Sequence, residues 1–229
     1  SGRETLCRVI AGSIAQMMVG KISPQTEVVG VTTQIGSICH PLENMSPLEF
    51  EKFLNSNLAQ LTTSQVDQFA TRMPDANKNA EIERLLLDAK ANGKSYGGKV
   101  RIFIKNPPKY LGQPVFHKFK SDLGAAFMSI GATSGVSLGI GDGAAAEEGS
   151  QFHAQSGSAH YGGVRGGITT GETIYLDIFF KPTATVLDVA KKGRHDPCIV
   201  PRAVPVIEAM TWLVLADHLL WQRQDQVSY

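Results

Sequence analysis

Apolar side chains recur at three- and four-residue spacing in several stretches of this sequence, which is the spacing of one face of a helix. Small residues in the first stretch allow a close neighbour, and the second is amphipathic and ends before Asn92 and Gly93, a common C-terminal signal. The third follows a proline, and the fourth begins with Pro205 at a first-turn position. We therefore expect four helices, over residues 4–19, 80–91, 115–130 and 205–224.

Other stretches have the composition and alternation of strands, namely residues 27–38, 99–105 and 173–181. In the second of these, Val100, Ile102 and Ile104 alternate with residues that are mostly charged, so we expect one face of the sheet to be buried and the other to be partly wet. Strands and helices do not alternate as they do in a doubly wound fold. The pattern predicts an α+β fold with an antiparallel, half-covered sheet, and it leaves residues 41–79 as an unassigned helical or irregular insertion.

Composition narrows the class of protein. Of 229 residues, 42% are apolar and 19% are charged, and the net charge is +1, so neither disorder nor nucleic-acid binding is indicated. No linker divides the chain, and we expect a single domain over residues 1–229. Three cysteines without a C-x-x-C pair indicate neither a disulfide framework nor a zinc site, which is typical of a reducing compartment. The longest apolar run, residues 210–220, contains Asp217 and His218 and is shorter than the ~20 residues of a membrane span, so we expect no membrane partner.

Two glycine-rich segments are candidates for contact with a ligand. Residues 139–144 have the form G-x-G-x-x-A of a dinucleotide-binding turn, but Gly149 and Ser150 interrupt the helix that must follow, and no acidic strand end comes later. This argues against an NAD-dependent reductase. In residues 162–168, four glycines leave the backbone free to approach a flat ligand or to present N–H groups to an anion. A tight turn between strands explains the same residues, and the segment alone leaves both explanations open.

Two later segments carry charge in a constrained backbone. Residues 193–198, with the sequence GRHDPC, place three ionisable side chains between a glycine and a proline. This suits a rigid presentation of charge, but a solvated turn explains the segment equally well when it is taken alone. Residues 181–185, KPTAT, follow a predicted strand with a cation and hydroxyl groups, which suits a phosphate at the end of a sheet. If the first segment is extended, alternation turns His195 away from its neighbours, and we favour Asp196 as the functional residue.

Together these segments resemble, in order and over nearly the whole chain, those of the chorismate synthase family. The matching blocks also include residues 1–5 (SGRET) followed by Arg8-Val9 and Ala11-Gly12, residues 112–116 (GQPVF), residues 128–130 (MSI) followed by Ala132, and residues 162–168 (GGVRGGI). The resemblance implies a β-α-β sandwich, in which antiparallel sheets are sandwiched with helices. Members of the family carry a long N-terminal stretch, with catalytic histidines and substrate-binding arginines, that this chain lacks. We therefore expect the chain to correspond to the C-terminal two-thirds of such an enzyme.

By resemblance, the expected activity is that of a carbon–oxygen lyase that converts 5-enolpyruvylshikimate 3-phosphate to chorismate and phosphate. This anti-1,4-elimination, without net redox change, is the last common step of the shikimate pathway to the aromatic amino acids. Reduced FMN is the implied cofactor, and NADPH is a candidate reductant for it. The alternative is an inactive fragment that binds FMN or serves assembly. The implied partners are this small-molecule substrate and further copies of the chain in a homotetramer, in the cytoplasm or, for a plant-like source, in a plastid.

The resemblance also implies roles for single residues, and no metal. Asp196 is the expected catalytic residue, a base in the proton path that involves flavin N5, and its alternative role is to cap or to pair with Arg194 or Arg202. These two arginines and Lys181 are the cations expected to attract the leaving phosphate. Gly131 departs from the family, which often has Asn or Pro there, so a side-chain contact is lost. The positions that match flavin contacts are Ser1, Gly131, Ala132, Gly166, Lys181, Pro182, Thr183, Ala184, Thr185 and Arg194.

Overall fold

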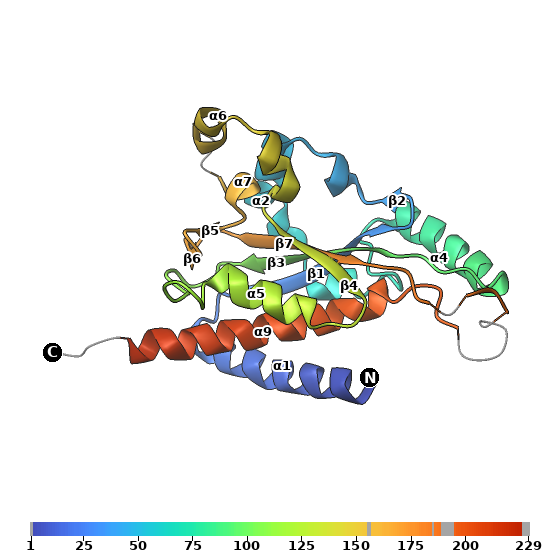
Figure 1. Ribbon diagram of the computed structural model, residues 1–229, viewed down its shortest axis with the longest axis horizontal. Coiled ribbons are helices and arrows are strands. Elements are labelled where there is room, and N and C mark those ends of the chain that lie inside the picture. Colours follow the sequence, from blue (N-terminus) through green and yellow to red (C-terminus); the bar gives the residue numbers. More distant parts are fainter. Residues whose placement is uncertain (1, 155–156, 185, 189–194, 226–229) are drawn as a thin grey trace.

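The computed structural model describes residues 2–154, 157–184, 186–188 and 195–225 (Figure 1). Its helices are α1 (Gly2–Ile22), α2 (Pro47–Ser56), α3 (Thr63–Val66), α4 (Ala76–Ala91), α5 (Phe119–Met128), α6 (Gly149–Ala154), α7 (Ser158–Tyr161) and α9 (Val200–Gln224). Its strands are β1 (Glu27–Ile35), β2 (Ile38–Cys39), β3 (Gly98–Lys105), β4 (Thr133–Leu138), β5 (Val164–Arg165), β6 (Ile168–Thr169) and β7 (Ile174–Phe180). Short 3-10 turns lie at Pro41–Asn44, Leu58–Gln60 and Gly141–Ala146.

A five-stranded antiparallel sheet forms the centre of the molecule, in the order β2-β1-β3-β7-β4 (Figure 1). The middle strand, β3, is paired on both sides: Ile102 lies opposite Gly30 of β1 and opposite Leu176 of β7. Strands β5 and β6 form a separate two-stranded hairpin. The predicted α+β class and the antiparallel arrangement are therefore confirmed.

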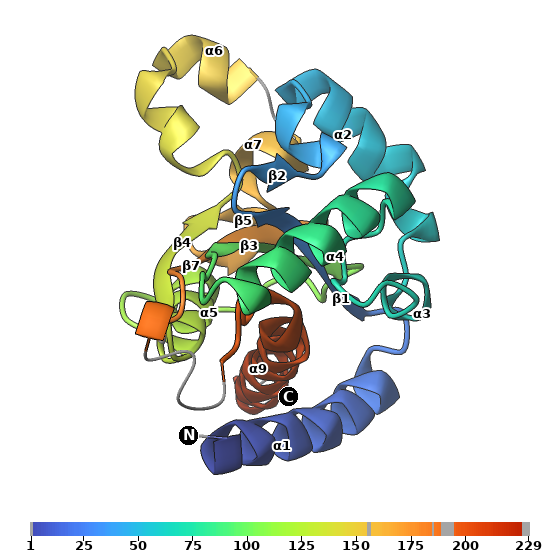
Figure 2. The same cartoon turned by 90° about the vertical axis from the view of Figure 1, so that its right-hand side faces the viewer.

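Helices α9 and α1 form two successive layers on one face of the sheet (Figures 1 and 2). Helix α9 contacts β1 and β3, α5 lies beside α9 and contacts β4, and α1 packs on the outer side of α9. The close approach of α1 depends on Gly12, since a Cβ atom there would lie 2.4 Å from the Cβ atom of Ala209. Helix α9 is long and apolar enough to cross a membrane by length and composition, but 61% of its most apolar window is buried by its neighbours in this fold.

The opposite face of the sheet is covered as well, and here the sequence expectation of a partly wet face is wrong. Lys99 and Arg101 are only 9% and 7% exposed. Arg101 forms a bidentate ion pair with Asp177, in which Nε lies 2.6 Å and Nη2 lies 2.7 Å from the carboxylate oxygens. Glu43 binds Lys99 and lies 3.3 Å from Arg101. The reason is that residues 41–79, unassigned from the sequence, fold as helices and turns over this face, so its charges are buried as pairs.

The observed boundaries of α5 and α9 differ from the predicted ones, whereas α1 and α4 include their predicted ranges. Helix α5 begins at Phe119, because Val115 has a φ of 64° and so lies outside the helical region. Helix α9 begins at Val200, with Pro201 in its first turn, so the prediction that Pro205 starts this helix is wrong. Pro205 lies inside the helix, one turn later, where its missing N–H leaves the carbonyl of Pro201 without its usual partner.

The predicted strands correspond to β1, β3 and β7. The first ends at Ile35, since a turn with Gly36 at a φ of 58° separates it from β2. The edge strand β4 has no counterpart among the predicted elements. Its residues 133–138 contain only two large apolar side chains, and their pairing with β7 is what makes them a strand.

Candidate functional site

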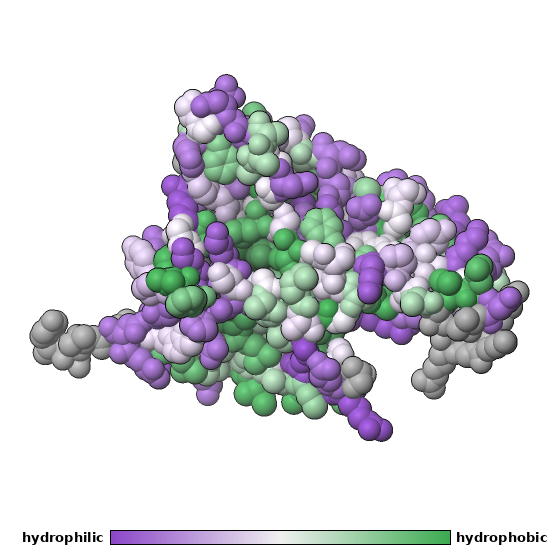
Figure 3. Space-filling model, viewed as in Figure 1, coloured by the Kyte–Doolittle hydropathy of each residue, from purple (hydrophilic) through white to green (hydrophobic). Residues whose placement is uncertain are grey.

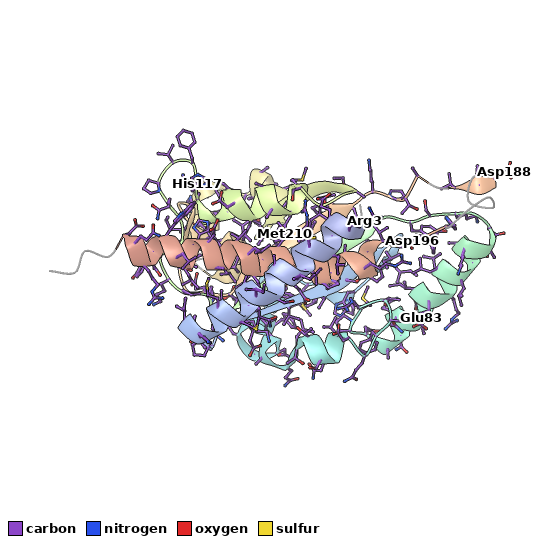
Figure 4. All side chains as sticks on the ribbon, turned by 90° about the horizontal axis from the view of Figure 1, so that it is seen from below. Arg3, Glu83, His117, Asp188, Asp196 and Met210 are labelled. Carbon is purple, nitrogen blue, oxygen red and sulfur yellow. The ribbon has the colours of Figure 1, made fainter. Side chains whose placement is uncertain are left out.

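A cavity of about 490 Å³ opens where the start of α1, the turn after α5 and the approach to α9 meet. Its lining includes Arg8 and Glu4 of α1, Gly131 after α5, and Asp196 and Arg202 at the start of α9. Figure 4 shows the labelled side chains of Arg3 and Asp196 at this same end of the paired helices. A cavity of this volume with a few convergent polar groups is typical of a small-molecule site.

The carboxylate of Asp196 is held at both oxygens. Oδ1 accepts a hydrogen bond from the backbone N–H of Cys198 at 3.3 Å, and Oδ2 lies 3.0 Å from Nη1 of Arg202. The Arg202 side chain is 76% exposed, so this ion pair orients the carboxylate more than it stabilises the fold. The main chain is fixed by Thr183, whose hydroxyl donates to the Asp196 carbonyl at 2.8 Å. Asp196 is thus a fixed acceptor at the edge of the cavity.

His195 and Cys198 flank this aspartate, but their side chains do not line the cavity. Nε2 of His195 is 2.7 Å from the carbonyl oxygen of Lys94. Cys198 is buried, and burial raises the pKa of its thiol to about 11. The thiol therefore stays protonated near neutral pH and is a poor nucleophile.

The turn that follows α5 connects two of the segments singled out in the sequence. Ala132 has a φ of 69°, which is uncommon for a residue with a side chain, and its carbonyl accepts a hydrogen bond from the Lys181 N–H at 3.1 Å. Pro182 and Ala184 lie in the same exposed segment, which Thr183 ties to Asp196. The structure therefore brings residues 131–132, 181–184 and 196 into one neighbourhood.

Gly131 itself faces open space, since a Cβ atom built there would meet nothing within 4 Å. A methyl group at this position would therefore meet no other atom. The glycine leaves its backbone accessible from the cavity instead.

Gly166 lies apart from this neighbourhood. It forms the turn between β5 and β6 with a φ of 60°, so the explanation of this segment as a tight turn between strands is confirmed. The carbonyl of the adjacent Gly167 accepts from the N–H of Phe119, at the first residue of α5, whereas Gly131 follows the last. The 10 residues of α5 separate these two ends by roughly 15 Å. The flavin contact of Gly166 stays a prediction, and Ser1, Thr185 and Arg194 lie outside the described residues.

Sequence reasoning missed Arg8, which connects two walls of the cavity. Its Nη1 donates to Oγ of Ser129 at 2.7 Å, and its Nη2 lies 2.6 Å from Oε1 of Glu4. The guanidinium lowers the pKa of the Glu4 carboxyl by hydrogen bonding and by its charge. The spacing of Glu4 and Arg8 is a visible signal for their pairing. The partner on α5 is 121 residues away in sequence, and no local pattern indicates it.

In the part of the chain that the structure describes, no three His, Cys, Asp or Glu side chains are grouped so as to hold an ion. The groups offered by the cavity are guanidiniums, carboxylates and backbone amides.

Comparison with known proteins gives a consistent result. The profile of the chorismate synthase family matches residues 1–220. Chorismate synthase of Bdellovibrio bacteriovorus is 52% identical over 227 residues, which are 99% of this chain and 62% of the relative. Chorismate synthase of Christiangramia forsetii is 35% identical over 99% of this chain and 64% of its own length.

A solved structure gives the same family. The crystal structure of a chorismate synthase superimposes with a TM-score of 0.80 at 28% identity, and it covers 97% of this chain and 65% of that protein. The chain thus spans slightly less than two thirds of the proteins it matches. With a profile matched over residues 1–220 and a relative at 52% identity, the chain belongs to the chorismate synthase family.

Proposed function

We propose that this protein acts as a chorismate synthase, which eliminates phosphate from 5-enolpyruvylshikimate 3-phosphate to give chorismate. The observation that carries the proposal is the cavity that gathers Asp196, Gly131, Arg8 and Arg202 from distant parts of the chain. The family membership reported above supports it. Because the matched relatives are longer than this chain, the activity and the substrate are both part of the proposal.

Reduced FMN is the proposed cofactor, and features of the described residues fit it. Gly131 has open space in place of a side chain, Lys181 is exposed, and the segment 181–183 is hydrogen-bonded to both Ala132 and Asp196. Backbone groups of the turn would face the flavin ring, and the Lys181 ammonium and Thr183 would hold its phosphate. When bound, the reduced flavin would supply electron density to the substrate ring as the phosphate departs.

The residues of this chain would bind the leaving group and move a proton. Arg202 lies at the cavity with most of its guanidinium exposed, so it can attract the phosphate of the substrate while it also faces Asp196. The Asp196 carboxylate would accept a proton at Oδ2, and the Cys198 N–H at Oδ1 would keep its orientation during the transfer.

A direct test is anaerobic turnover of 5-enolpyruvylshikimate 3-phosphate with reduced FMN, measured as released phosphate. Asp196→Asn should reduce the rate by roughly 100-fold or more, since a positioned base contributes about that much. Glu83→Gln on α4 is a matched control, because Glu83 does not line the cavity, and it should turn over like the unchanged protein. Turnover by Asp196→Asn at the unchanged rate would exclude its role as the base.

The same assay separates the enzyme from an inactive fragment. Bound FMN without phosphate release would favour a fragment that only binds the cofactor or serves assembly. Absence of both would contradict the proposal as a whole. A homotetramer, a cytoplasmic location and NADPH as the source of electrons remain predictions from the family. Sedimentation at micromolar concentration tests the first, and a strict monomer would contradict it.

A further inference from the structure

The two arginines at the cavity differ in their surroundings. Arg202 is largely exposed, whereas the Arg8 side chain is only 21% exposed and touches three elements. Besides its contacts to Glu4 and to Oγ of Ser129, its Nη2 lies 3.3 Å from the Ser129 carbonyl oxygen and its Nη1 lies 3.8 Å from Sδ of Met210. Arg8 therefore joins α1, the end of α5 and α9.

The position of Arg8 along α1 is fixed by helix packing. Arg8 lies four residues before Gly12, on the same side of the helix, and Gly12 packs directly against Ala209 of α9. This contact holds the backbone that carries Arg8. From this fixed backbone position, the guanidinium extends past α9 to the end of α5.

Ser129 is the last residue of the turn that ends α5, and its carbonyl is one of those that a helix end leaves without a partner. Arg8 donates to both the carbonyl and the hydroxyl of this residue. The planar guanidinium offers several N–H groups in a fixed fork, whereas a lysine ammonium in its place is a point charge on a flexible stem. The contact thus ties the end of α5 to α1.

The residues that follow Ser129 carry this position into the cavity. Ala132 keeps an uncommon positive φ, and such a conformation persists only where its surroundings hold it. Its carbonyl binds the Lys181 N–H, and Thr183 in the same segment binds Asp196. A continuous series of contacts therefore runs from Arg8 to the proposed base.

We propose that Arg8 is a positioning residue, which clamps the end of α5 to α1 and so places the Gly131–Ala132 turn and the 181–183 segment for the ligand. That the ligand is FMN rests on the proposed function. The clamp itself rests on the contacts of Arg8 alone, so the two can be tested separately.

The clamp is tested by amide hydrogen exchange of the 229-residue chain without ligand. The amides to follow are Ile130, Thr133 and Lys181, whose N–H groups bond across this turn. In Arg8→Met they should exchange roughly tenfold faster than in the unchanged protein. The reason is that the charged hydrogen bonds of Arg8 are lost, and their loss makes local opening of the turn about that much more frequent. The Asn92 amide, which bonds in the same way at the end of α4, is the internal control and should not change.

Conservative variants keep the test decisive if Arg8→Met does not fold. Arg8→Lys keeps the charge and should give an intermediate rate, and Ser129→Ala removes only the hydroxyl contact and should accelerate the same amides less. Unchanged exchange at all three amides in Arg8→Met, or in both conservative variants if it does not fold, would overturn the clamp.

Binding of FMN, followed by quenching of its fluorescence, links the clamp to the ligand. Arg8→Met should weaken binding roughly tenfold, and Arg84→Met, an exposed arginine of α4, should bind like the unchanged protein. Weaker binding with unchanged exchange would mean that Arg8 touches the ligand directly, which contradicts a positioning role. If the unchanged protein does not bind FMN, the proposed function fails, and hydrogen exchange still decides on the clamp.

Discussion

At the scale of single residues, one carboxyl between α9 and the sheet binds a backbone N–H group of β1. Glu208 of α9 faces β1, and its Oε1 accepts a hydrogen bond from the Gly30 N–H at 2.8 Å. Gly30 makes room for this contact, since a Cβ atom there would lie 2.8 Å from Cγ1 of Val204. Burial raises the pKa of the Glu208 carboxyl from 4.5 to about 7, against the opposing effect of the Gly30 hydrogen bond and of Arg72.

Because of the raised pKa of Glu208, we expect the free energy of unfolding to depend on pH. The folded state binds its proton more tightly than the unfolded state, so the contribution to the free energy of unfolding is complete below the unfolded pKa of 4.5 and is lost as the pH rises to about 7. A shift of this size corresponds to roughly 3 kcal/mol. Glu208→Gln should remove this part of the pH dependence, as measured by urea unfolding at pH 5 and pH 8. An equal loss of stability in both proteins would show that Glu208 does not titrate in this range.

At the scale of elements, helix α1 shows how glycine sets a packing distance. Gly12 and Gly20 lie on the same helix, but only Gly12 meets another backbone, with the Cα and the carbonyl oxygen of Ala209 within 2.7 Å of a built Cβ atom. Around Gly20 nothing lies within 4 Å. The two glycines are therefore a matched pair that separates packing from helix propensity.

Gly12→Ala should lower the free energy of unfolding by about 1–3 kcal/mol, because the added methyl group forces α1 away from α9. Gly20→Ala should instead raise it by roughly 0.5–1 kcal/mol, as alanine is the better helix former in open space. Thermal and urea unfolding of both variants checks the pair. A stabilising Gly12→Ala would show that α1 does not pack on α9 in solution.

At the scale of the whole molecule, the outer face of α1 is unusual. Leu6, Ile10, Ile14 and Met17 follow one another along it and are 53–63% exposed. They contribute to the apolar surface over α1 at the bottom of Figure 3. Rows of exposed apolar side chains lower solubility, and they are otherwise typical of surfaces that meet another polypeptide.

Replacing Ile10 and Ile14 together with Gln should leave the unfolding temperature of the chain nearly unchanged, because both side chains are exposed in the structure. Solubility should increase. Calorimetry and the concentration at which the protein precipitates measure the two effects. Leu213→Gln and Val214→Gln on α9, which are packed against the core, should by contrast lower the unfolding temperature. A large decrease in the unfolding temperature of the Ile10/Ile14 variant would show that this face is covered in solution.

The candidate site was predicted in part. Residues 181–184 and Asp196 stand out in the sequence as charge and hydroxyl groups in a constrained backbone, and the structure brings them together with the turn at 131–132. Gly166 carried an equally clear local pattern, yet it lies at the other end of α5. For Arg8 the sequence shows only the spacing that pairs it with Glu4, because its contact with Ser129 joins residues 121 positions apart.

The sequence by itself determined the helices α1 and α4, the strands β1, β3 and β7, and the family, because periodicity and local motifs are properties of neighbouring residues. Only the tertiary structure decided that residues 41–79 cover the charged face of β3 and that residues 133–138 form an edge strand. Each of these depends on pairing or burial by segments far away in the chain, and the free energy of such contacts is not encoded in any one stretch.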